Sequence, residues 1–363
     1  MGEFGEVFAD MPDPRADNVV HDLRELLFIA LLATLSGATS CADMALFART
    51  KAYLLRGVLT LKGGLPSHDT FSRVFRMLDP VAFEKAFRRF MRAFAAAAQI
   101  KPPRGVVAID GKALKRGYDR GKSHMPPMMV TAWAAQTRIA LANVLAPGNN
   151  EAKAAVQLVE LLQLKGCVVT ADALHCRRDL AAAIRARGGD YVLAVKDNQP
   201  LLLRDAQAAL AARCAAPAAA TRDARHGRNE MRSATVVATP GLADRHDFPG
   251  LKAVACITSR RGRDKPISRY FVLSQVFATD DLLRIVREHW SIENRLHWPL
   301  DVVLDEDLAR NRKDHAPANL AVLRRLALNV ARAHPDDKTP LRAKLKIAGW
   351  DDSYLFSMIA HMR

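Results

Sequence analysis

The chain has 363 residues, half of them apolar, so it is too apolar for wholesale disorder and long enough for more than one hydrophobic core. Lysine and arginine number 54 against 38 acidic residues, and this net charge of +16 favours a polyanionic partner over a small-molecule substrate. The longest apolar run, residues 26–35, is too short to span a bilayer, and the five cysteines form no Cys-x-x-Cys pair. These properties argue against a membrane protein and a zinc site, and favour a cytoplasmic protein that binds nucleic acid.

The first 20 residues are polar and contain proline, and we expect an N-terminal tail there. Apolar residues then recur at helical spacing between Leu23 and Leu35, and Pro66-Ser67-His68-Asp69 is typical of a helix cap. Residues 21–100 are therefore predicted to form a small all-helical domain. We expect it to bind DNA, although charged helix faces are more often only solvated. Its basic residues are Arg73, Arg76, Lys85, Arg88, Arg89 and Arg92.

A proline-rich link at 101–105 precedes a change to strand-like patterns. The run Val106–Ile109 is apolar and β-branched, as in a buried strand, and ends at Asp110-Gly111-Lys112. Further strands are predicted at 128–135, 138–146, 167–171 and 191–196, and helices at 150–164 and 177–187. Three strands, a helix, a strand, a helix and a strand are the order of a ribonuclease H-like mixed sheet.

The pattern after this sheet indicates one more helix, at 199–214, and then an alanine-rich link. Strand-like segments at 233–238, 252–257 and 268–273 predict a β-strand insertion over about 224–276. A helix is expected from Thr279 to Trp298, where Pro299 should end it, and another at 315–332. We therefore predict an α/β catalytic domain at 101–335, which contains the insertion, and a C-terminal tail at 336–363.

Two aspartates follow strands that are neighbours in this fold. Asp172 comes directly after the strand 167–171, as Asp110 comes after its own strand. Alone, Asp110 would more simply be a turn residue, but two carboxylates at one sheet edge repel each other and favour a cation between them. Mg²⁺, or Mn²⁺, prefers such oxygen ligands, and two such ions support phosphoryl displacement.

Glu293 is the candidate third carboxylate. Within the expected helix it shares a face with Val286, Trp290 and His297, instead of lying on the charged side. Four other acids compete for this role and rank behind Glu293, because a position beyond Pro299 should hold them less rigidly. They are Asp301, Asp305, Glu306 and Asp307.

Polar residues near the three acids are candidates for DNA contact. The predicted set is Lys112, Lys115, Arg116, His175, Lys196, Asn198, Asn294, Arg295 and His297. For the lysines a solvated side chain is about equally favoured, and for His175 a helix-cap or core position. Trp133, Trp290 and Trp298 could stack on an extruded base, but core packing is the favoured interpretation for each. No Walker loop or His-Glu-x-x-His spacing is present, so neither ATP use nor zinc hydrolysis is indicated.

Four segments together resemble the ISAs1 group of insertion-sequence transposases, which is related to the IS4-type DDE enzymes and includes the H-repeat-associated proteins. They are Ala108-Ile-Asp-Gly-Lys112, Thr170-Ala-Asp-Ala-Leu-His175, Val195-Lys-Asp-Asn-Gln199 and His289-Trp-Ser-Ile-Glu-Asn-Arg-Leu-His-Trp298. The segment Pro66–Phe71 is similar to the helical region that precedes the DDE domain in this group. Each motif is weak alone, but their order and separation make the resemblance specific, and it extends from about residue 21 to 333.

The resemblance implies a DDE triad of Asp110, Asp172 and Glu293 that holds the metal ions. It also implies double-stranded DNA as the partner, both as the terminal inverted repeats of the element and as target DNA, in the bacterial nucleoid. Pairing of two ends would favour a homodimer in the DNA complex. The chain departs from the IS4-type signature at Val286, His289 and Leu300, where relatives carry Tyr, Arg and Lys, so the DNA-end contacts of that signature do not transfer.

Two other functions are compatible with the same residues. A ribonuclease H-like nuclease would use this site without strand transfer. An inactive transposase remnant would act only as a DNA-binding protein, and its acids would then be structural. The complete set of three acids favours the transposase over the remnant.

Overall fold

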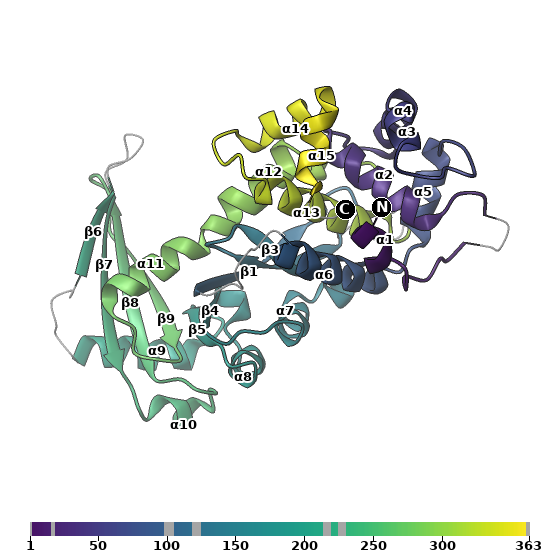
Figure 1. Cartoon of the computed structure of the whole chain (residues 1–363). Coiled ribbons are helices and arrows are strands. Elements are labelled where there is room, and N and C mark those ends of the chain that lie inside the picture. Colours follow the sequence, from purple (N-terminus) through teal and green to yellow (C-terminus); the bar gives the residue numbers. More distant parts are fainter. Residues whose placement is uncertain are drawn as a thin grey trace.

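A mixed β-sheet runs through the molecule and helices cover both of its faces (Figure 1). The computed structural model describes residues 2–15, 19–97, 105–117, 125–212, 219–223 and 230–360. Residues 101–104 of the predicted proline-rich link lie outside these residues, and Gly105, the last residue of that link, instead begins β1. Residues 213–218, which include the end of the predicted helix 199–214 and the start of the alanine-rich link, also lie outside them. In chain order the strands are β1 (Gly105–Ala113), β2 (Met128–Ala134), β3 (Ile139–Leu145), β4 (Cys167–Ala171), β5 (Asp190–Val195), β6 (Ala219–Asp223), β7 (Glu230–Ala238), β8 (Ala253–Arg261) and β9 (Ile267–Leu273).

The nine strands lie in the order β3-β2-β1-β4-β5-β9-β8-β7-β6. β4 pairs in parallel with both β1 and β5, whereas β2 is antiparallel to β1 and β3 is antiparallel to β2. This is the strand order of a ribonuclease H-like fold, as the sequence predicts. The last residue pair between β1 and β4 is Ile109 with Ala171, so β1 continues past the end of its parallel neighbour.

The strands of the predicted insertion extend the central sheet. β7, β8 and β9 confirm the three strand-like segments, and β6 is an additional strand that the pattern did not predict. β9 pairs antiparallel with β5, which joins this group to the parallel strands. The expected start of the insertion, at 224, lies outside the described residues.

Helices fill the remaining chain. They are α1 (Gly2–Val7), α2 (Leu23–Leu35), α3 (Cys41–Thr50), α4 (Ala52–Arg56), α5 (His68–Met77), α6 (Pro80–Ala97), α7 (Glu151–Glu160), α8 (Arg178–Ala186), α9 (Pro200–Ala212), α10 (Leu242–His246), α11 (Thr279–His289), α12 (Trp298–Val302), α13 (Ala316–Ala333), α14 (Leu341–Trp350) and α15 (Asp352–Met358). The predicted cap is confirmed, because the side chain of Ser67 accepts the N–H of Thr70 at 3.2 Å at the start of α5. None of the helices described is long and apolar enough to cross a membrane.

The N-terminal helices share one hydrophobic core with the sheet. A single cluster of buried side chains joins residues of α2, α6 and α13 to Ala108, Met129 and Trp133 on β1 and β2. On the opposite face, α7 and α8 pack over Val107 and Ile109 (Figure 1). Alternate residues of β1 therefore face different layers of helices.

Both expected tails contain packed helices. Phe4 and Phe8, in and just after α1, are buried, and each has its ring about 6 Å from that of Phe90 in α6. At the other end, Leu345 in α14 and Leu355 in α15 belong to the same core. The interpretation as tails was wrong because a few large apolar side chains anchor segments whose composition is otherwise polar.

Candidate active site

Asp110 and Asp172 occupy equivalent places on adjacent parallel strands. Each directly follows the last residue pair between β1 and β4. Asp110 Oδ1 accepts the N–H of Gly111 at 2.9 Å, and Asp172 Oδ1 accepts the N–H of Leu174 at 3.2 Å, as cap of the 3₁₀ turn Ala173–His175. The structure thus brings the two carboxylates to one edge of the sheet, as the strand order predicts.

Glu293 begins a π-helical turn. α11 ends at His289, the π-helical turn spans Glu293–His297, and α12 follows directly. The expectation of a helix that ends at Pro299 was wrong, because Pro299 lies within α12. Proline lacks the N–H that an α-helix needs, and the wider turn before it changes the bonding pattern locally. Single π-helical turns are frequent at functional sites.

Side-chain hydrogen bonds fix the segment that carries Glu293 to the sheet. The indole Nε1 of Trp133, on β2, donates to Ser291 Oγ at 3.1 Å. Thr170 Oγ1, on β4, lies 3.0 Å from Nδ1 of His289. The segment just before Glu293 is therefore anchored at two residues, one to β2 and one to β4.

Asp110 lies in a strongly acidic environment. Burial, followed by the negative charges of Asp172, Glu293 and Glu151, raises the pKa of Asp110 to about 7, although the hydrogen bond from Gly111 opposes this shift. We call Asp110, Glu151, Asp172 and Glu293 the acid cluster. Glu151 was not predicted: it is the first residue of α7, behind the cap Asn150.

The histidines beside the acid cluster are neutral near pH 7. Burial lowers the pKa of His289 to about 4. Burial, together with the charges of Arg325 and Lys112, lowers the pKa of His297 to about 3. Nδ1 of His297 lies 3.6 Å from Oδ2 of Asp110. These imidazoles therefore do not offset the charge of the acids.

The acid cluster has the chemistry of a site for a hard divalent cation. It offers carboxylate oxygens with unbalanced negative charge, which Mg²⁺ and Mn²⁺ prefer. Within the described part of the chain, no three His, Cys, Asp or Glu side chains are already close enough together to hold one ion. The residues fit such an ion by type and charge.

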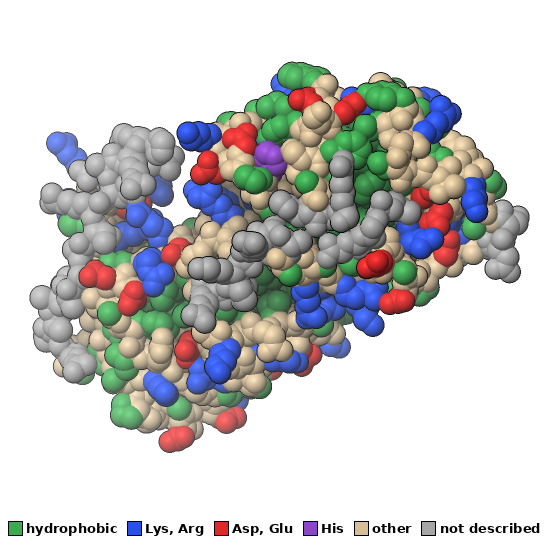
Figure 2. Space-filling view, in the orientation of Figure 1, with side chains coloured by type: hydrophobic (Ala, Val, Ile, Leu, Met, Phe, Trp, Pro, Cys, Tyr) green, Lys and Arg blue, Asp and Glu red, His purple; other side chains and the backbone are tan. Residues whose placement is uncertain are grey.

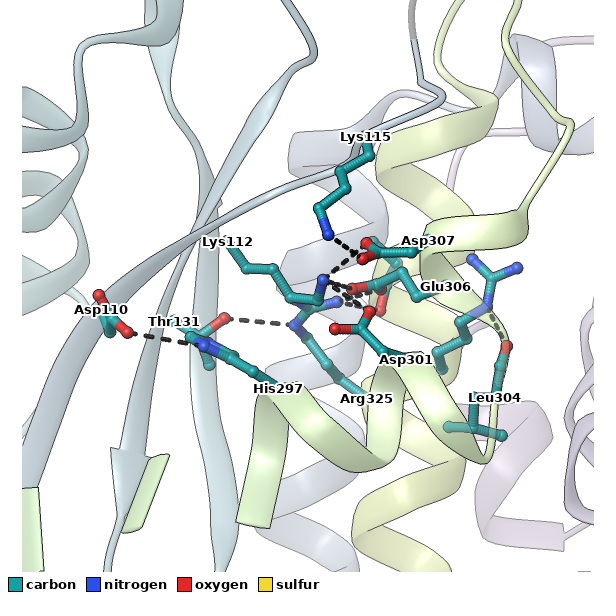
Figure 3. Close-up of polar contacts among 12 residues, drawn as sticks. Asp110, Lys112, Lys115, Thr131, His297, Asp301, Leu304, Glu306, Asp307 and Arg325 are labelled. Atoms are coloured by element: carbon teal, nitrogen blue, oxygen red, sulfur yellow. Dashed lines mark hydrogen bonds and ion pairs between the residues drawn. The ribbon is translucent and has the colours of Figure 1, made fainter. Parts of the chain in front are cut away.

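Lys112 lies in a second charged group, next to the acid cluster. Its side chain is 7% exposed, and its Nζ lies 2.7 Å from Asp301 Oδ1 and 2.9 Å from Asp307 Oδ1. Asp307 also binds Lys115. Figure 3 shows these groups gathered around α12, with Asp110 set apart and facing His297. Lys112 thus connects β1 to the segment that follows Glu293.

Arg325, on α13, completes this group. It is fully buried, and its Nη1 donates to Glu306 Oε1 at 2.8 Å while its Nε donates to Thr131 Oγ1 at 3.2 Å (Figure 3). We call the group the ion-pair cluster; its members are Lys112, Lys115, Arg325, Asp301, Glu306 and Asp307. The expectation that acids beyond Pro299 are held less rigidly was wrong, because Lys112 and Arg325 bind three of them.

Most of the other candidates for DNA contact are exposed, whereas His175 is buried and His297 is half-buried. The exposed ones are Lys115, Arg116, Lys196, Asn198, Asn294 and Arg295. His175 is 1% exposed, and Asn198 Nδ2 donates to the carbonyl of Ala173 at 2.6 Å, so Asn198 also holds the turn after Asp172. DNA contact by any of these residues stays a prediction.

The tryptophans differ from one another. Trp133 is fully buried, as predicted, but Trp290 and Trp298 are 37% and 57% exposed, so core packing was the wrong interpretation for both. Arg269 lies over the ring of Trp290, 5.4 Å from its centre. Both exposed rings are therefore open to solvent, one before and one after Glu293 in the chain.

The basic residues of the N-terminal helices are also divided. Three of the six form ion pairs: Arg76 with Asp314, Arg88 with Glu84 and Arg89 with Asp10. The other three are exposed, namely Arg73, Lys85 and Arg92.

Known proteins resemble this chain over nearly its whole length. It is 30% identical to the protein named "Putative protein YbfL" and 29% identical to the "H repeat-associated putative transposase YhhI", both of Escherichia coli K12; each alignment covers 96% of this chain and 96% of the relative. An uncharacterized protein of the dhlA 3′ region of Xanthobacter autotrophicus is 37% identical over 74% of this chain and 92% of its own length. A chain in the cryo-EM structure of the piggyBac transposase synaptic complex with hairpin DNA matches with a TM-score of 0.47 and 12% identity, over 99% of this chain and 77% of that chain.

Two family models match successive parts of the chain. Residues 5–91 match the family described as DDE_Tnp_1-associated. Residues 101–330, which include the whole acid cluster, match the family described as Transposase DDE domain. The second match covers more than half of the chain, and the protein therefore belongs to the Transposase DDE domain family.

Proposed function

We propose that this protein is an ISAs1-type DNA transposase that cleaves phosphodiester bonds at the ends of its own element and joins the freed 3′-hydroxyl groups to target DNA. One observation supports the proposal most strongly: the negative charges of Asp172 and Glu293, which come from two other elements, help to raise the pKa of Asp110 in a chain of the Transposase DDE domain family. The similarity to an H repeat-associated protein supports the ISAs1 assignment.

In this proposal the three carboxylates bind Mg²⁺ or Mn²⁺ together with a DNA phosphate. The bound cation would supply Lewis acidity for the attacking oxygen and offset the charge that develops on the phosphate. Asp110 must lose its proton to act as a ligand, and because its pKa is about 7 in the metal-free protein, a proton would compete with the cation below neutral pH. Lys112 and the anchors of Ser291 and His289 keep the acids in position.

DNA would bind over the basic surface around this site. The net charge of +16 supports a strong, salt-dependent attraction to phosphates. Figure 2 shows a notch between the β6–β9 end of the sheet and the body that carries α12 and α14, with lysine and arginine side chains on both sides of it. The exposed rings of Trp290 and Trp298 are available to stack on an unpaired base next to Glu293.

A cleavage assay with labelled DNA tests the proposal. The substrate is the terminal sequence of the element, which the short inverted repeats flanking the coding region would identify. Asp110→Asn should lower the Mg²⁺-dependent cleavage rate at least about 100-fold, because it removes a ligand charge, while DNA binding in a mobility-shift assay persists. Asp244→Asn is the matched control, since Asp244 is an exposed acid in α10, outside the segments that resemble the transposases. Undiminished cleavage by Asp110→Asn would overturn the assignment.

A supercoiled target distinguishes the related functions. Joined products between labelled ends and target DNA are expected only from a transposase. Cleavage without joining would indicate a nuclease, and DNA binding without cleavage would indicate an inactive remnant. We expect the joining complex to contain two copies of the chain, because two ends must be paired, and light scattering of the DNA complex measures this number.

A further inference from the structure

Glu151 approaches the acid cluster from the helix layer opposite to the N-terminal helices. It is the first residue of α7, which packs against β2, β3 and the turn that Asp172 caps. A Cβ atom at Gly111 would collide with the carboxylate of Glu151, so the absence of a side chain at Gly111 makes room for it. Gly111 directly follows Asp110, and Glu151 therefore reaches the cluster beside the same stretch of β1.

The environment of Glu151 differs from that of an ordinary acid at a helix start. Such an acid is stabilised by the helix dipole, which lowers its pKa. The pKa of Glu151 is instead raised, by burial and by the negative charge of Asp172. Burial and the charge of Asp172 thus disfavour the ionised form of Glu151 in the metal-free protein.

His175 is the other titratable group that faces Glu151. Its Nε2 lies 4.0 Å from Glu151 Oε2, and its imidazole is 1% exposed. Its Nδ1 has no hydrogen-bond partner among the described residues, and burial lowers the pKa of His175, so the ring is neutral near pH 7. Within the described part of the chain, no lysine or arginine forms an ion pair with Glu151. Its charge is therefore left for another cation.

We propose that Glu151 is a fourth carboxylate of the catalytic site and binds the same divalent cation as Asp110 and Asp172. Gly111 is the residue that permits this approach. The inference rests on the proposed function, because it assigns an additional ligand to the same metal site.

Calorimetric titration of the full-length protein with Mn²⁺ alone tests this assignment. Glu151→Gln keeps the size and most of the packing of the side chain but removes its charge. We expect it to weaken Mn²⁺ binding at least about tenfold, as Asp110→Asn should also do. Glu160→Gln is the matched control, since Glu160 is an exposed acid at the far end of the same helix, and it should bind Mn²⁺ like the wild type.

The contact with Gly111 provides a second, independent test. Gly111→Ala should displace the Glu151 carboxylate and weaken Mn²⁺ binding, because the added methyl group occupies its place. In a Glu151→Ala background the same change should have little further effect, since the colliding atoms are then absent. A loss of affinity of equal size in both backgrounds would show that Gly111 acts independently of Glu151.

Thermal unfolding without metal distinguishes a site residue from a structural one. Glu151→Gln should leave the melting temperature at pH 8 unchanged or raise it, because repulsion within the cluster is relieved. A lower melting temperature with unchanged Mn²⁺ affinity would show that Glu151 only stabilises the start of α7, and would overturn the inference. If Asp110→Asn loses Mn²⁺ binding and Glu151→Gln does not, only this inference fails; if wild type shows no saturable Mn²⁺ binding, the proposed function fails with it.

Discussion

Two groups of charged side chains meet β1 only two residues apart, yet they are built in opposite ways. The ion-pair cluster around Lys112 contains three cations and three acids, and most of its charges have a partner within 3 Å. The acid cluster around Asp110 contains four carboxylates, and His289 and His297 beside it are neutral near pH 7. The charges of the first group are balanced within the protein, whereas we propose that a divalent cation balances those of the second.

This difference separates a structural role from a chemical one. Balanced buried charges stabilise the fold only as a complete set, because removal of one partner leaves the other unpaired. Unbalanced acids destabilise the metal-free fold, and a bound cation relieves their repulsion. Substitutions in the two groups should therefore change stability with opposite sign, and the following predictions test this from the largest expected effect to the smallest.

Loss of Arg325 should have the largest effect. Arg325→Leu leaves Glu306 buried without its partner and should lower the free energy of unfolding by about 3–5 kcal/mol, measured by urea denaturation. The control is Arg187→Leu at an exposed position, for which a change below about 0.5 kcal/mol is expected. Equal changes in the free energy of unfolding for Arg325→Leu and Arg187→Leu would show that the pair of Arg325 with Glu306 contributes no stability of its own.

Lys112 and Lys115 form a matched pair, because both bind Asp307 but only Lys112 is buried. Lys112→Met should lower the free energy of unfolding by about 2 kcal/mol, since Asp301 and Asp307 lose their shared cation. Lys115→Met, at a side chain that is 66% exposed, should cost less than about 0.5 kcal/mol. Denaturant unfolding measures both changes. Similar losses of unfolding free energy for the two substitutions would show that burial of Lys112 does not strengthen its ion pairs.

Asp110→Asn should change stability in the opposite direction. The raised pKa means that the carboxyl favours the folded state fully below its unfolded pKa of about 3.9, and that this contribution is lost as the pH rises to about 7. At pH 8 without metal, the substitution should therefore raise the free energy of unfolding by about 2 kcal/mol. At pH 3 it should give no such gain, so unfolding curves at the two pH values provide the check.

The smallest effect is expected at an anchor of Glu293. Ser291→Ala removes the hydrogen bond from Trp133 and should cost about 1 kcal/mol. Because this bond fixes the segment before Glu293, the DNA cleavage rate should fall about tenfold while Mn²⁺ affinity changes less. A variant that loses stability but cleaves DNA at the normal rate would show that the anchor serves only the fold.

The sheet and two of the acids could be predicted because their signals are local. Continuous apolar runs that stop at Asp110 and Asp172 identify buried strands, although β1 itself continues to Ala113. The order of elements places those strands side by side. Glu293 was predicted from the residues that share its face of the expected helix, and its role stays a prediction. The π-helical turn beneath it was not predicted, because proline rules describe an isolated helix and not one whose bonding shifts before Pro299.

The contacts of Lys112 and the position of Glu151 could not be predicted from the sequence. Lys112 follows an acid in a strand, as a phosphate-binding lysine could, but its partner Asp307 lies 195 positions later. Glu151 has an ordinary local explanation as the first acid of a helix. Only the structure shows that the carboxylate of Glu151 lies next to Gly111 and that its charge interacts with those of Asp110 and Asp172.

The core that joins the N-terminal helices to β1–β3 limits how such proteins can diverge. The two family models meet between residues 91 and 101, which suggests separable modules, but the buried side chains form one cluster across that boundary. A gene fragment that begins at residue 101 would encode a sheet with an uncovered apolar face. Exchange of the helical region between relatives should therefore require compensating changes on β1, β2 and α13, so the two parts must evolve together.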